Sequence, residues 1–194
     1  MSQITSAYSI AHPHYLMYKA AEFALARADA DEKLRSLHVA TVYAMSAFAL
    51  EAYVNDVCAV SIPEAVWGLV ERRLNTSEKI KLLEAYIPFS TDPSREPFQL
   101  LKPLFRIRDE LAHCKRQVVE VESQALSAQP LVIPRAELER HLDDVSLAKK
   151  LHKGVFDMVT ILHSARIEKD RETHPFESVA ASLFIEVKLT KVKG

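Results

Sequence analysis

The chain has 194 residues, of which 48% are hydrophobic and 26% charged, a balance that excludes a disordered chain and favours one globular domain spanning residues 1–194. Only three glycines occur, and long stretches rich in alanine, leucine, glutamate and lysine favour an all-α fold over a turn-dense β architecture. The formal net charge is -1, so any contact with nucleic acid must come from a local basic patch rather than from the overall field.

Apolar residues at helical spacing predict a helix from Pro13 to about Ala30 and a longer one from Leu34 to about Val60. The longer helix is apolar on most faces, which is typical of a central, enclosed helix. Two shorter helices are predicted next, from Pro63 to Leu74 and from Thr76 to about Tyr86. The residues Thr76-Ser77-Glu78 are expected to cap the second of these two helices.

The second half of the chain predicts two further long helices. An amphipathic helix is expected from about Glu96 into the segment around His113, with Pro103 in its first turns or at a kink. Another is expected over residues 135–167, and Gly154 could break it. Five or six helices are therefore predicted, with a core over about residues 15–167.

Two segments alternate between apolar and polar residues as short strands do. They cover residues 117–122 and 183–190, and they could pair with each other in one chain or across a dimer. The predicted fold is therefore an all-α helical bundle with a small two-stranded β appendage.

Several features favour a soluble, cytoplasmic protein without a membrane partner, cofactor or metal. The first residues lack the order of a signal peptide, and the apolar stretch from Val39 to Leu50 is too short to span a bilayer. Cys58 and Cys114 show neither disulfide nor zinc spacing. The histidines around His14 and His141 supply no closed set of metal ligands.

Two charged residues fall within apolar stripes. Arg108 shares a helix face with Leu104 and Leu111, and Glu51 lies in line with apolar residues of the central helix. A charge in such a place needs a partner, so we expect an Arg108–Glu51 ion pair between the packed helices. On helix spacing alone this pair is a buried structural contact.

The neighbours of Arg108 add acid–base chemistry to this position. Asp109 precedes His113 by four residues, so on a helix its carboxylate lies under the imidazole and could fix its tautomer or raise its basicity. Arg108 lies roughly 140° from His113 around a helix, so one helix cannot aim both side chains at one atom. Two copies facing each other across a twofold axis would bring them into a shared cleft, which predicts a homodimer.

The segment Arg108-Asp109-Glu110-Leu111-Ala112-His113 resembles the R-x4-H signature of the HEPN superfamily, placed on a core helix. The upstream residues 46–55 also resemble the HEPN helix that carries an acidic residue. The resemblance covers about residues 15–167. It implies a helical-bundle homodimer that cleaves RNA without a metal, as a toxin of a toxin–antitoxin pair or another defence component, with an antitoxin or other protein as a possible partner.

The resemblance also implies a role for each residue of the site. His113 would be the general base or acid, and Arg108 would stabilise the charge of the phosphorane. Asp109 would orient the site, and Glu51 would support it. Many proteins that resemble the active HEPN members only bind or scaffold, so a non-catalytic domain for nucleotide, RNA or protein binding is the second hypothesis.

Four cations lie beside the motif: Lys102, Arg106, Lys115 and Arg116. They could hold RNA phosphates in spite of the nearly neutral total charge. They could equally form a solvated helix face.

Overall fold

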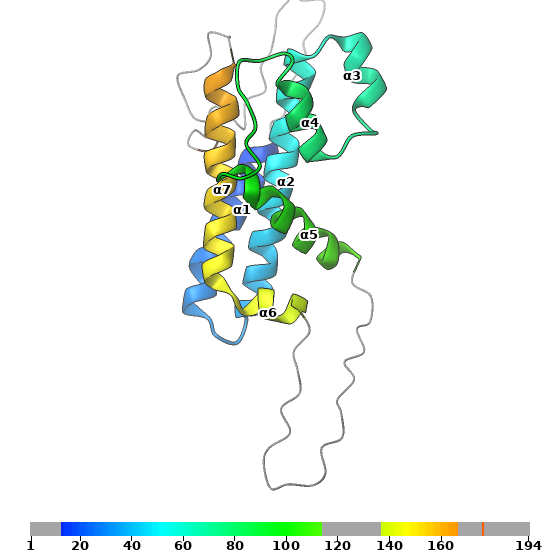
Figure 1. Cartoon of the computed structure of the whole chain (residues 1–194). Helices are drawn as coiled ribbons and strands as arrows, with labels where there is room; N and C mark the ends of the chain where they lie inside the picture. Colours follow the sequence, from blue (N-terminus) through cyan, green and yellow to red (C-terminus); the bar gives the residue numbers. More distant parts are fainter. Residues whose placement is uncertain (1–12, 114–136, 167–175, 177–194) are drawn as a thin grey trace, which may run out of the picture.

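The computed structural model describes residues 13–113, 137–166 and 176, and every structural statement below concerns these residues. The helices are α1 (Pro13–Ala30), α2 (Arg35–Ser61), α3 (Glu64–Val70), α4 (Thr76–Leu83), the short 3-10 helix η1 (Phe98–Leu100), α5 (Leu101–Ala112), α6 (Glu137–Asp143) and α7 (Val145–Ala165) (Figure 1). The all-α prediction is confirmed for this part of the chain. The segments predicted as strands, 117–122 and 183–190, lie outside the described residues.

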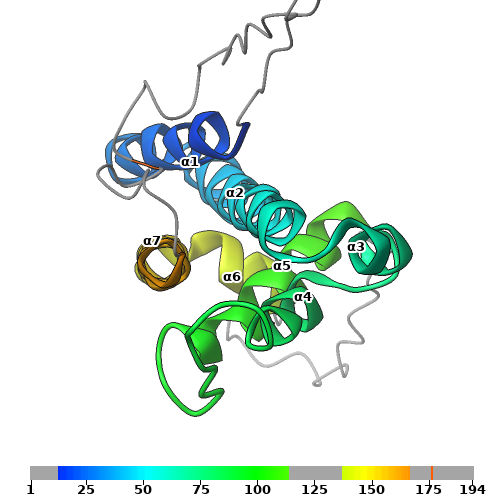
Figure 2. The ribbon, with the colours of Figure 1, turned by 90° about the horizontal axis from the view of Figure 1, so that it is seen from above.

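Helix α2 forms the centre of the bundle. It contacts each of the other six α-helices of the described chain. Seen from above, α1 and α7 lie on one side of it and α3, α4 and α5 on the other (Figure 2). Its length and composition would also allow it to cross a membrane, but half of its most apolar window is buried within the bundle. Packing on several sides therefore accounts for its apolar sequence, as predicted for a central helix.

A buried layer of rings joins α1, α2 and α7. Tyr18 of α1 stacks on His152 of α7, with ring centroids 4.3 Å apart, and on Phe176, with centroids 4.1 Å apart. The Ser46 hydroxyl of α2 is hydrogen-bonded to Nδ1 of His152 over 2.9 Å. The stacked rings and this buried hydrogen bond together hold three helices against one another.

Helix α4 begins at Thr76 as predicted, but its capping residue differs from the prediction. Asn75, not Thr76, is the capping residue, and its side chain accepts a hydrogen bond from the Glu78 amide at 3.0 Å. The Glu78 carboxylate in turn accepts a hydrogen bond from the Asn75 amide at 2.8 Å. This reciprocal capping box satisfies two amides that the helix itself cannot, while Thr76 is buried as the first helical residue.

The predicted helix over residues 135–167 is two helices, which is why the described chain has more α-helices than expected. The break lies at Asp144, whose side chain caps α7 by accepting from the Leu147 amide at 2.8 Å. Gly154 lies inside α7 and breaks nothing, so the expectation for it was wrong. A Cβ there would lie 2.6 Å from Cδ1 of Leu100, and the glycine therefore allows η1 to approach α7 closely.

Candidate functional site

Helix α5 carries most of the candidate site and is held against α2 by its apolar stripe. Leu101, Leu104 and Ile107 are buried, and Pro103 lies in the first turn, where it removes no helical hydrogen bond. The helix crosses α2 obliquely and also contacts α6 (Figures 1 and 2). This packing places Arg108 on the flank of α5 that faces α2.

The ion pair expected between Arg108 and Glu51 is confirmed. Nη2 of Arg108 lies 3.6 Å from Oε2 of Glu51, and Nη1 lies 3.2 Å from Oδ1 of Asp109. The Arg108 and Glu51 side chains are 24% and 37% exposed, so the pair lies at the surface and not in the interior as their apolar stripes suggested. A ligand in solution can therefore reach the pair.

Two aromatic rings flank the Arg108 guanidinium. Its Cζ lies 5.3 Å from the ring centre of Phe105 on α5 and 5.9 Å from that of Phe48 on α2. Both distances fall within the range of cation–π attraction. The rings and the two carboxylates together restrict where the guanidinium can lie, which prepares it to bind an anion without a large loss of side-chain entropy.

These two phenylalanines were not among the residues predicted for the site. A signal was present in their spacing. Phe105 precedes Arg108 by three residues, and Phe48 precedes Glu51 by three residues, so each ring lies one turn from its charged residue on the same helix face.

The guanidinium of Arg108 retains unused hydrogen-bonding capacity. A guanidinium carries five N–H donors. The contact with Glu51 is longer than a hydrogen bond, and the Nε atom is closed to solvent without a hydrogen-bond partner among the described residues. An oxyanion that approaches the exposed Nη edge would therefore gain donors that the two carboxylates have not saturated.

His113 does not continue the helix as expected. Helix α5 ends at Ala112, and His113 follows with φ -119° and ψ 29°. Its amide donates to the Asp109 carbonyl at 2.9 Å, and its side chain is exposed. The Asp109 carboxylate forms an ion pair with Arg108, its neighbour in the chain. The structure thus brings Arg108, Asp109 and Glu51 together, with His113 at the end of the same helix.

The predicted RNA-binding cations differ from one another in the structure. Arg106 lies 3.0 Å from Glu137 of α6 and 3.8 Å from Glu110, so its charge is balanced and it ties α5 to α6. Lys102 is exposed and forms no ion pair within the described chain. Lys115 and Arg116 lie outside the described residues.

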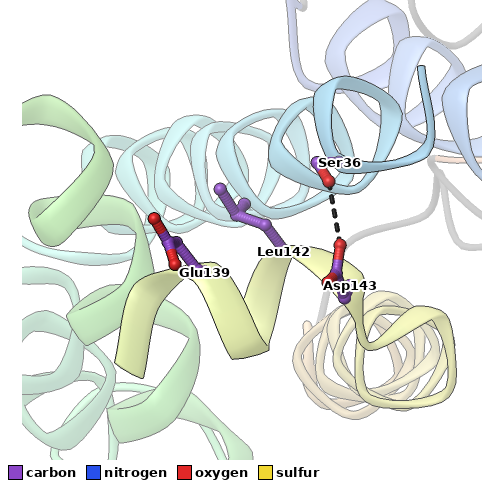
Figure 3. A pocket seen from close by; sticks show the side chains of 4 residues that line it. All are labelled: Ser36, Glu139, Leu142 and Asp143. Atoms are coloured by element: carbon purple, nitrogen blue, oxygen red, sulfur yellow. Dashed lines mark hydrogen bonds between the residues drawn. The ribbon is translucent and has the colours of Figure 1, made fainter. Parts of the chain in front are cut away.

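An open hollow of about 340 Å³ lies between α6 and the first turn of α2, and the prediction did not include it (Figure 3). It is lined by Ser36, Glu139, Leu142 and Asp143, and the Ser36 hydroxyl donates to Asp143 at 3.0 Å. Two carboxylates among these four lining residues make it unsuited to a phosphate. None of the residues predicted for the RNA site lines it.

Two other chemistries find little support in the described residues. Over residues 13–113 and 137–166, no three histidine, cysteine, aspartate or glutamate side chains gather as metal ligands. Burial raises the pKa of the Cys58 thiol to about 12, so Cys58 is not an activated nucleophile.

Comparisons with known proteins identify no relative: no family model, curated protein or solved structure matches the chain. Fold and site therefore define the class only as an all-α bundle with an arginine–carboxylate cluster on its surface, and function must be argued from that cluster.

Proposed function

We propose that the protein is a metal-independent endoribonuclease of HEPN type, with a composite site at a homodimer interface, and that it serves as a toxin or defence component. The observation that carries the proposal is the Arg108 guanidinium, which lies at the surface between two rings and two carboxylates with donors to spare. A solvent-exposed histidine, His113, follows five residues later, directly after the last residue of the same helix. Arginine and histidine are the groups that phosphoryl chemistry needs at neutral pH.

The reaction follows from these groups. His113 accepts the proton of a ribose 2′-hydroxyl, whose oxygen attacks the neighbouring phosphorus while the bond to the 5′-oxygen breaks. Arg108 donates hydrogen bonds to the phosphorane oxygens, where negative charge increases. The imidazolium of His113 then donates a proton to the leaving 5′-oxygen. The products would be a 2′,3′-cyclic phosphate and a free 5′-hydroxyl.

Asp109 and Glu51 would act through Arg108. Both carboxylates contact its guanidinium, so they fix its orientation and do not touch the substrate. This assignment differs from the role suggested for Asp109 by sequence, which was to orient His113. The two carboxylates are positioning residues on this proposal.

A second copy of the chain would complete the site. Arg108 pairs with Glu51 of α2, whereas His113 lies beyond the last residue of α5. Two such helices related by a twofold axis would pair the arginine of one copy with the histidine of the other. A catalytically competent dimer is therefore part of the proposal.

The experiment measures cleavage of a labelled RNA in the presence of EDTA by the wild type, His113→Ala and Arg108→Ala. We expect the histidine variant to lose about 10²–10⁴-fold in rate and the arginine variant about 10²–10³-fold. Arg73→Ala, which removes an exposed arginine from the turn after α3, is the matched control and should keep full activity. Equal rates for all four proteins would reject the ribonuclease assignment.

One observation favours the non-catalytic hypothesis instead. Two carboxylates already oppose the single charge of Arg108, which is the arrangement of a structural ion pair. On that hypothesis the wild type binds RNA, a nucleotide or a protein without cleaving RNA, and Arg108→Ala lowers the stability of the fold but changes no rate. The same four proteins, followed by cleavage and by thermal unfolding, separate the two hypotheses.

A further inference from the structure

Phe48 is a large apolar side chain that the core does not need. The residue is 36% exposed, whereas its chain neighbours Ala47, Ala49 and Leu50 are fully buried. A single exposed phenylalanine is ordinary on a protein surface. This one lies one turn before Glu51 and 5.9 Å from the Arg108 guanidinium, so it belongs to the same patch of surface as the proposed site.

The patch combines two kinds of binding group. The Nη2 atom of Arg108 lies too far from Glu51 for a hydrogen bond, so the partly exposed guanidinium can still donate to an oxyanion, and the exposed part of the neighbouring Phe48 ring offers an apolar surface. A nucleotide is the ligand whose own layout matches, because it carries an anionic phosphate and a flat base a short distance apart. Stacking of a base on an aromatic ring is a main source of affinity in proteins that bind single strands.

We infer that Phe48 is a stacking platform for an unpaired nucleobase next to the phosphate held by Arg108. This inference rests on the proposed function and adds a subsite to it. The ion pair beside the ring, formed by Glu51 and Arg108, favours a nucleotide over a protein helix, whose docking would bury these charges beside an apolar surface. Arg108 is the cation beside the ring, and it offsets part of the repulsion of RNA by Glu51 and Asp109.

A stacking platform at Phe48 would select RNA by the accessibility of its bases. In an A-form duplex each base is paired and stacked between its neighbours, so its face is closed to Phe48. The platform therefore accepts bases from single strands, loops or bulges. It reads a π-face and not hydrogen-bonding groups, so it should tolerate any of the four bases.

The test uses short RNA oligonucleotides with 2′-O-methyl groups, which block the attacking hydroxyl and separate binding from cleavage. One carries 2-aminopurine, whose fluorescence falls on stacking, and a duplex of the same sequence serves for comparison. Phe48→Leu should weaken single-strand binding roughly 5- to 150-fold, as expected for one lost stacked base, and abolish the fluorescence change. Phe48→Trp should restore both the affinity and the fluorescence change. The duplex should bind to the wild type and to Phe48→Leu with the same affinity.

The chain offers a matched control in Phe23→Leu. Phe23 is 64% exposed on α1 and has its own arginine, with Cζ of Arg27 5.3 Å from the ring centre. It thus repeats the phenylalanine–arginine pair at a place where no site is proposed. Its variant should bind like the wild type.

Each result decides between the inference and the function on which it rests. If Phe48→Leu binds like the wild type while unmodified RNA is cleaved, the platform is wrong and the ribonuclease stands. If binding depends on Phe48 but no RNA is cleaved, the platform stands on a non-catalytic RNA-binding protein. If Phe48→Leu changes the oligomeric state but not the affinity for RNA, the platform is refuted. It is also refuted if the wild type binds no RNA.

Discussion

Acid should destabilise this protein through one histidine. His152 is buried on α7, stacked on Tyr18 and hydrogen-bonded to Ser46. Burial lowers the pKa of His152 from its usual 6.5 to about 4, with opposing smaller effects from Glu22, which raises the pKa, and Lys19, which lowers it. The folded protein therefore binds a proton at this ring less readily than the unfolded chain does.

The sign and size of the effect follow from this difference. Above the unfolded pKa of 6.5 the ring is neutral in both states, and the contribution of buried His152 to stability is fully present. This contribution is lost as pH falls through the interval from 6.5 to about 4. The full loss for His152 is about 3 kcal/mol, because each unit of pKa difference corresponds to about 1.4 kcal/mol. At pH 5 the loss is already about 2 kcal/mol, equivalent to about 4–8 °C in Tm for a chain of this size.

The assay compares urea unfolding of the wild type with that of His152→Gln between pH 8 and pH 5. Glutamine is neutral throughout and can still bond to Ser46, so the free-energy advantage of the wild type over the variant should shrink by about 2 kcal/mol over this range. His38→Gln, at a half-buried histidine of α2, controls for the loss of a histidine as such. A gap between the wild type and His152→Gln that stays constant with pH would refute the reasoning.

Two further predictions concern packing. Gly154→Ala should destabilise the fold by about 1 kcal/mol, because overpacking against Leu100 outweighs the gain in helix propensity. Gly68→Ala places its Cβ in open space and should stabilise the fold by about 0.5–1 kcal/mol. Urea unfolding checks both, and equal stabilisation by the two changes would contradict the close approach at α7. Phe176→Ala should cost about 3 kcal/mol, because its ring is 1% exposed, while Phe23→Ala at 64% exposure should cost under about 0.5 kcal/mol. Similar costs for the two would show that Phe176 does not contribute to the core.

The helices were predictable where periodicity and termini agree. Helix α1 was predicted to the residue, and α2 was predicted within one residue at each end. The prediction failed where a single side chain decides locally: Asn75 and not Thr76 caps α4, and Asp144 separates α6 from α7 and caps the second of these helices. Propensity alone suggested a break at Gly154, but the close contact with Leu100 that explains this glycine is tertiary and leaves no mark in the local sequence.

For the candidate site, sequence patterns predicted the Arg108–Glu51 pair but not its surroundings. The pair was predicted from two charges that lie in apolar stripes. A charge in such a place needs a partner of opposite sign, and packed helices can supply one to each other. Its exposure could not be predicted, because this depends on the angle at which α5 crosses α2. The end of α5 at Ala112 also escaped the periodicity, since the helical pattern runs on through His113.

The candidate site is formed by the same pattern on two helices, a phenylalanine three residues before a charged residue. Phe48 and Glu51 are one turn apart on α2, as Phe105 and Arg108 are on α5, and the crossing of these helices brings the four side chains into one cluster. Each helix contributes a ring and a charge, so the guanidinium is held by partners from both. A shift of α5 along α2 by one turn would separate Arg108 from both Glu51 and Phe48. The packing of α5 on α2, with Leu104 and Ile107 of α5 buried, therefore fixes the geometry on which binding of a phosphate and a base would depend.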